Sequence, residues 1–133
     1  MSAVSNKTHY NEMNVLSMHA LIGAYQQQGY EWVDELNQVL AGNIEYFCTY
    51  AEKHWKGVSY SRPQGTYMVF LDCTEWCRDH GHDIQWLLDE GARVGAGYQD
   101  GRPFHAEYGI RVNLALPFSR VQEAFRRLNE YVF

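Results

Sequence analysis

The sequence predicts an α/β (α+β) sandwich, in which a small and mostly antiparallel sheet carries helices on one face. Apolar residues recur every three or four positions up to about residue 55, which is typical of two amphipathic helices. From residue 58 onward they alternate or form the short runs that are typical of strands. A last amphipathic pattern closes the chain, so the predicted order of elements is α-α-β-β-α-β-β-α.

The helices are predicted from their apolar spacing and their caps. The first begins near Asn14 and stops at Gly29, with an apolar face of Met18, Leu21, Ile22 and Tyr25. The second runs from about Tyr30 to Trp55, with one stripe formed by Val33, Leu36, Leu40, Ile44, Phe47 and Ala51. The last helix is predicted to be capped by Ser119. Its core face consists of Val121, Phe125, Leu128 and Val132.

Strands are predicted at 58–61, 66–72, 93–96 and 109–116, where β-branched and aromatic residues gather. Cys73 to Asp83 is expected to be a polar loop, and Asp83 to cap a short helix that ends near Gly91.

The last predicted strand places an arginine on the sheet face that the helices leave open. Strand side chains alternate, so Ile110, Val112, Leu114 and Leu116 point toward the helices. Arg111 and Asn113 then point the other way, together with Ala115. A guanidinium can hold a carboxylate through two parallel hydrogen bonds. Periodicity alone leaves two interpretations open, a carboxylate ligand or an ordinary solvated arginine.

Composition excludes several classes of function. The 133 residues suit one domain, and a hydrophobic share of 46% excludes general disorder. A net charge of −5 without a basic stripe argues against nucleic-acid binding. No apolar run approaches the ~18 residues of a membrane span, and the polar N-terminus lacks a signal peptide. Three cysteines, an odd number, favour a reducing, cytoplasmic environment.

Three other motifs give weak functional signals. Cys73, Cys77, His80 and His82 could bind a metal, but their spacing differs from paired zinc motifs, so a metal-free loop is the preferred interpretation. The segment 94–97 lacks the full glycine spacing of a nucleotide-binding loop. The remaining histidines are scattered and have no obvious nucleophile beside them.

Four stretches taken together resemble the C-terminal small domain of fold-type I pyridoxal-phosphate enzymes. The first runs from Ala24-Tyr25 through Gly29 to Trp32-Val33-Asp34-Glu35-Leu36, and the second is Asn43. The third is the segment 63–72, Pro-Gln-Gly-Thr-Tyr-Met-Val-Phe-Leu-Asp. The fourth is Gly101-Arg102-Pro103-Phe104 followed by 111–117, Arg-Val-Asn-Leu-Ala-Leu-Pro. The match is strongest to the class I/II aminotransferase-like C–S lyases, the MalY/PatB cystathionine β-lyase group. One departure is His105, where the family usually has glycine.

The resemblance implies a domain at residues 13–133, preceded by a flexible segment at 1–12. It implies that Arg111 binds the α-carboxylate of an amino-acid substrate. The intact enzyme would be a pyridoxal 5'-phosphate-dependent C–S β-lyase or an aminotransferase, and a homodimer.

The catalytic lysine and the cofactor site belong to a large domain in that family, and Lys7-Thr8 stands too close to the first helix to match the lysine motif. We therefore expect no catalytic, cofactor-binding or metal-binding residue here, and no activity of the isolated chain. The alternative is a free-standing, non-catalytic binding or interaction module of the same fold.

Overall fold

A computed structural model describes residues 14–133, which divide into two compact units between residues 37 and 38. The segment predicted to be flexible, 1–12, and Lys7 lie outside the described residues. No helix in the described part of the chain is long and apolar enough to cross a membrane.

The first unit contains α2 (Val15–Ala24) and the start of α3 (Gln27–His54). The Asn14 side chain caps α2 by accepting a 2.8 Å hydrogen bond from the Ser17 backbone N–H. Gly29, the predicted stop, lies inside α3 instead, and the break falls at Tyr25 and Gln26. A side chain at Gly29 would meet the Ala24 carbonyl oxygen at 1.9 Å, so this glycine is required by the tight turn and does not end a helix.

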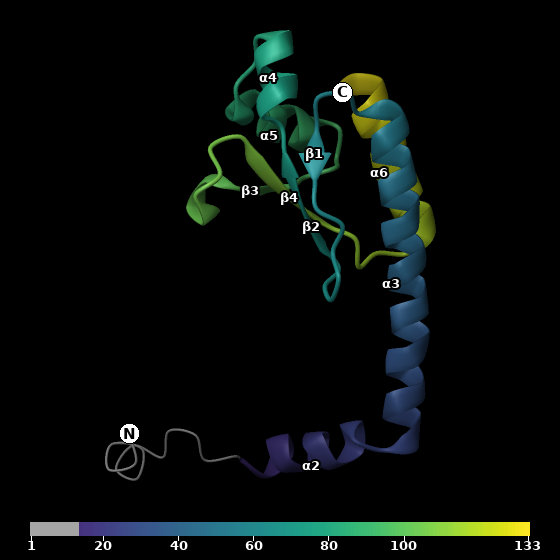
Figure 1. Cartoon of the computed structure of the whole chain (residues 1–133). Coiled ribbons are helices and arrows are strands. Elements are labelled where there is room, and N and C mark those ends of the chain that lie inside the picture. The colour runs from purple at the N-terminus through teal and green to yellow at the C-terminus, as the bar shows by residue number, and fades with distance from the viewer. Residues whose placement is uncertain (1–13) are drawn as a thin grey trace, which may run out of the picture. The chain divides into compact units, whose positions relative to one another are not determined.

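The second unit is built on a four-stranded antiparallel sheet with the order β1-β2-β4-β3 (Figure 1). The strands are β1 (Ser59–Tyr60), β2 (Met68–Asp72), β3 (Gln99–Asp100) and β4 (Gly109–Asn113). In the central pair, Val69 lies opposite Val112 and Leu71 opposite Ile110, and all four side chains are buried. This confirms the predicted alternation within β4, although Leu116, also predicted to point inward, lies beyond the strand and is 46% exposed. The predicted fold class is confirmed.

Helices α3 and α6 (Phe118–Tyr131) lie side by side along the unit (Figure 1). Their contact is largely aromatic: the Phe125 ring centroid lies 5.7 Å from those of Phe47 and Tyr50 and 5.2 Å from that of Trp55. The predicted core face of α6 is confirmed, because Val121, Phe125, Leu128 and Val132 are buried. The predicted cap is wrong: Pro117 stands at the N-cap position and Ser119 lies within the helix.

The segment predicted as a polar loop, Cys73–Asp83, contains the helix α4 (Thr74–His80). It buries Trp76 and Cys77, and Gly81 ends it in a left-handed conformation with φ 69°. Asp83 then caps α5 (Ile84–Arg93), as predicted, by accepting from the Trp86 N–H at 2.8 Å.

The predicted strand at 93–96 is also wrong. Gly95 turns the chain there with φ 75°, and pairing begins only at β3. The predicted strand at 109–116 is shorter, because the Asn113 side chain accepts a hydrogen bond from the Ala115 N–H at 2.7 Å and bends the chain.

Candidate functional site

Arg111 lies at the centre of the sheet, on the face that points away from the buried core. In register it pairs with Phe70 of β2 on one side and Gln99 of β3 on the other. The side chain is half-buried, and its Nε is buried without a hydrogen-bond partner among residues 14–133. The placement predicted from strand alternation is therefore observed, and the guanidinium retains unused donors.

The other arginines of the chain show that a guanidinium without an anionic partner is unusual here. Six of the eight form an ion pair with a carboxylate, whereas Arg111 and Arg120 have no such partner among residues 14–133. The nearby Asp100 is already engaged, because the Arg102 guanidinium bonds it and lowers its pKa. A buried or half-buried guanidinium with no internal anion is suited to an external one.

Two aromatic rings complete the surroundings of Arg111. The Phe104 ring lies under the guanidinium, with its centroid 4.6 Å from the Arg111 Cζ. The Phe70 ring meets Phe104 edge-on at 6.3 Å. The sequence motif contained Phe104 but assigned it no role. The period-two pattern of 66–72 was a signal that could have placed Phe70 beside Arg111.

Phe104 ends a short 3₁₀ helix, η1 (Arg102–Phe104), which turns back into the sheet at His105. His105 has φ 63°, the left-handed region that glycine prefers. His105 therefore adopts a backbone conformation that suits glycine, although its side chain departs from the family pattern.

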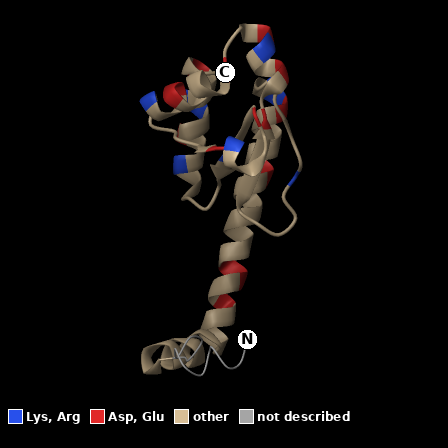
Figure 2. Cartoon of the chain, turned by 90° about the vertical axis from the view of Figure 1, so that its left-hand side faces the viewer, with Lys and Arg blue, Asp and Glu red and all other residues tan. Residues whose placement is uncertain are grey.

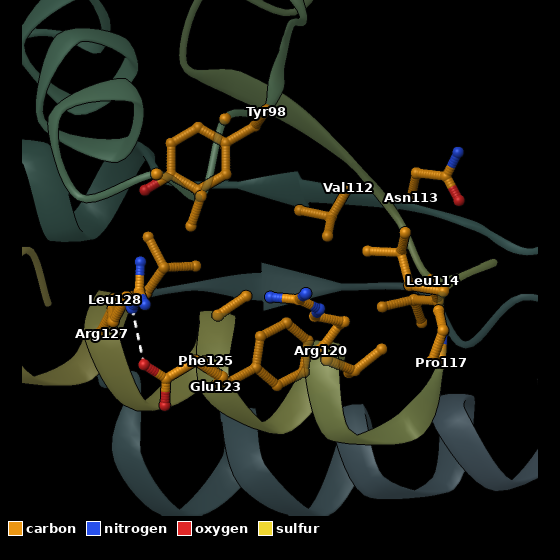
Figure 3. A pocket seen from close by; sticks show the side chains of 16 residues that line it. Tyr98, Val112, Asn113, Leu114, Pro117, Arg120, Glu123, Phe125, Arg127 and Leu128 are labelled. Atoms are coloured by element: carbon orange, nitrogen blue, oxygen red, sulfur yellow. Dashed lines mark hydrogen bonds and ion pairs between the residues drawn. The ribbon is translucent and has the colours of Figure 1, made fainter.

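A separate cavity of about 550 Å³ lies between α6 and the other face of the sheet (Figure 3). Val112, Leu114 and Phe125 form part of its apolar wall, and Arg120 is among the residues that line it. Arg111 is not in its lining, so the cavity and the Arg111 face are two distinct places.

The Cys/His cluster is not brought to one point. The thiols of Cys73 and Cys77 are buried in the core, while His80 is exposed and stacks on Trp76 at 4.4 Å. Among residues 14–133 no group of three or more His, Cys, Asp or Glu side chains is arranged to hold a metal. In the part of the chain that the structure describes, basic residues are scattered among acidic ones and form no stripe (Figure 2).

The described residues do not fit a pyridoxal-phosphate site by themselves. Such a site needs a lysine for the Schiff base and a cradle for the phosphate. The lysines of the described part are Lys53, in the last turn of α3, and Lys56, whose ammonium donates to the Glu52 carbonyl. Arg111 has Phe70 and Gln99 opposite it in the sheet and the Phe104 ring under its guanidinium.

The fold nevertheless matches parts of solved structures. It superimposes with a TM-score of 0.80 on a pyridoxal-phosphate-bound C–S lyase of Staphylococcus hominis, at 22% identity over 96% of this chain and 33% of that one. A mutant of Thermus thermophilus aspartate aminotransferase gives a TM-score of 0.78 at 16% identity, over 96% and 34%. The chain thus has the fold of one segment, about a third, of these two enzymes.

Sequence comparison leads to a more particular relative. A Mycobacterium leprae protein assigned as a cystathionine β-lyase is 47% identical, with a match that covers 75% of this chain and 28% of that protein. No family model matches the chain. The resemblance found in the motifs, to the C–S lyase and aminotransferase group, is confirmed. The chain spans about a third of the length of these proteins.

Proposed function

We propose that residues 13–133 are the small domain of a pyridoxal 5'-phosphate-dependent C–S β-lyase or aminotransferase, and that Arg111 binds the substrate's α-carboxylate. One observation carries the role of Arg111: its guanidinium lies on a central strand with a buried Nε that no residue of 14–133 satisfies. A strand holds the guanidinium in a fixed direction, as two parallel hydrogen bonds to a carboxylate require.

The rest of the site belongs, on this proposal, to a large domain in the longer protein. That domain supplies the cofactor and its lysine, and the whole enzyme forms a homodimer. The isolated chain is then inactive, since its described residues provide no cofactor site. The fraction of its relatives that the chain covers supports this division.

A chimera tests the role of Arg111. This chain replaces the matching segment of the Mycobacterium leprae relative, and steady-state kinetics are measured with cystathionine. We expect Arg111→Lys to raise KM by about 10- to 100-fold, since a point charge replaces a bidentate fork; this corresponds to about 1.5–3 kcal/mol for a hydrogen bond to a charged group. Arg120→Lys is the matched control, because Arg120 is the other arginine that has no ion pair within the described residues, and it should leave KM unchanged. An Arg111→Lys chimera with the parental KM would contradict the proposal.

The cavity beside α6 favours a second candidate, a non-catalytic module that binds small molecules. Its volume falls within the range of small-molecule sites and its walls are largely apolar. On this alternative the isolated chain binds a ligand of its own. Titration of the chain with a library of small organic acids, followed by the amide NMR signals of Ala124 and Leu128, would detect it. Shifts confined to the cavity would favour the module.

A further inference from the structure

We propose that Phe104 is a positioning residue, which fixes the plane of the Arg111 guanidinium so that its open edge receives the carboxylate. The inference rests on the proposed function of Arg111. It starts from the 4.6 Å between the Arg111 Cζ and the centroid of the Phe104 ring. At this distance the ring attracts the cation through its quadrupole.

The backbone holds Phe104 in this place. The Phe104 N–H donates to the Gly101 carbonyl at 2.9 Å, and the His105 N–H donates to that of Arg102 at 3.0 Å. The Gly101 N–H in turn donates to the Gly109 carbonyl at 2.8 Å, which ties η1 to the first residue of β4. A side chain at Gly101 would meet that same oxygen at 2.3 Å, so the loop can lie this close to the strand only with glycine there.

Phe70 holds the ring from the side. It lies opposite Arg111 in the sheet and meets the Phe104 ring at an interplanar angle of 84°. Gly109 leaves room for Phe70, since a side chain at Gly109 would meet the Phe70 ring at 2.6 Å. Phe104 is thus fixed by η1 and by Phe70, although 44% of its own surface is exposed.

A ring in this position covers one face of the guanidinium and limits its rotation. An arginine side chain on an open sheet face would sample many rotamers and would lose that freedom on binding. Phe104 therefore reduces the entropy cost of carboxylate binding without touching the carboxylate. Arg120, the other arginine without an ion pair, makes no cation–π contact within residues 14–133.

The geometry is tested on the 133-residue chain labelled with ¹⁵N. The Arg111 Nε–Hε signal, assigned by its loss in Arg111→Lys, should be shifted by the Phe104 ring current. Phe104→Leu should remove that shift and Phe104→Tyr should keep it. Phe118→Leu is the matched control, because Phe118 is a similarly exposed phenylalanine that packs against Tyr46. An Nε–Hε signal that does not respond to Phe104→Leu would overturn the proposal.

The consequence for binding is tested in the chimera. Phe104→Leu should raise KM roughly 3- to 30-fold, the range of a cation–π contact, with kcat changed less than about twofold. Phe104→Tyr should restore KM, which a general loss of packing would not explain. If Arg111→Lys raises KM and Phe104→Leu does not, the inference fails while the proposed function stands. If Arg111→Lys has no effect, the proposed function fails and the positioning role fails with it.

Discussion

At the scale of single residues, Asn43 connects α3 to the strand that carries Arg111. Its side chain is 1% exposed, and its Nδ2 donates to the carbonyls of Leu114 at 2.7 Å and Leu116 at 2.8 Å. These carbonyls follow directly after β4, where the chain has left the sheet. The buried amide thus supplies the donor to the Leu116 carbonyl and a second donor to the Leu114 carbonyl, which also accepts from the Leu116 N–H at 2.9 Å.

Asn43→Ala should lower the free energy of unfolding by about 2 kcal/mol, because it leaves the Leu116 carbonyl without its donor and the Leu114 carbonyl with the Leu116 N–H alone. Urea unfolding followed by tryptophan fluorescence measures the change. Asn37→Ala on the same helix is the control, since Asn37 is exposed, and it should stay within about 0.5 kcal/mol of the parent. A loss below about 1 kcal/mol for Asn43→Ala would show that water replaces the amide easily.

Single residues differ in how far the sequence could place them. The sheet face of Arg111 was predicted because strand alternation is a local rule that needs only its immediate neighbours, whereas its role was inferred from the family resemblance. The role of Asn43 depends on a carbonyl 71 residues away, which no local pattern contains. The contact of Phe104 with Arg111 depends on the left-handed turn at His105. A histidine in the sequence does not predict that conformation.

At the scale of elements, length decided what could be predicted. Helix α6, with 14 residues, repeats its apolar face often enough to show the helical period, and its core face was predicted correctly. Helix α4 has seven residues and buries the adjacent Trp76 and Cys77, so no repeat is visible. Its N-cap residue, Cys73, makes no side-chain hydrogen bond, so the usual start signal is missing as well.

The correction at α4 has a measurable consequence for the cysteines. Cys48, Cys73 and Cys77 are all buried, and burial raises the pKa of the Cys73 and Cys77 thiols above the usual range. In the native chain at pH 8 we expect none of the three to react with iodoacetamide over a period in which the urea-unfolded chain reacts completely. Mass spectrometry gives the number of labels. Rapid labelling of Cys77 in the native chain would instead support an exposed loop.

Helix α6 also predicts a pH dependence. Arg126 and Arg127 both bond the Glu123 carboxylate and lower its pKa from 4.5 to about 2. Because the folded-state pKa is depressed, the stabilisation is present above pH 4.5 and is lost as the pH falls toward 2. The stability difference between the parent and Glu123→Gln should therefore shrink through this window, and urea unfolding at several pH values measures it. Glu130→Gln, which removes a different partner of Arg126, is the comparison. A difference independent of pH would exclude the mechanism.

At the scale of the whole molecule, α2 is a helix without a polar side. Its sequence contains no charged Asp, Glu, Lys or Arg residue, and no residue of it is buried. A helix that is apolar all round is normally covered by other protein. The chain also spans about a third of its relatives' length. Both observations agree with the proposed large domain as the cover.

The exposed apolar side chains of α2 make a prediction that separates the two candidate functions. Leu16 is 82% exposed and Ile22 55%, so the isolated chain should bind a hydrophobic dye such as ANS. The double variant Leu16→Gln/Ile22→Gln should lose at least about half of that fluorescence, because glutamine keeps the helix and the net charge but removes apolar surface. The double variant Val39→Gln/Leu116→Gln is the matched control, as both of its residues are exposed and neither belongs to α2. A chain that binds no dye would favour the free-standing module, since a module that functions alone has no missing partner and no reason to leave such a helix uncovered.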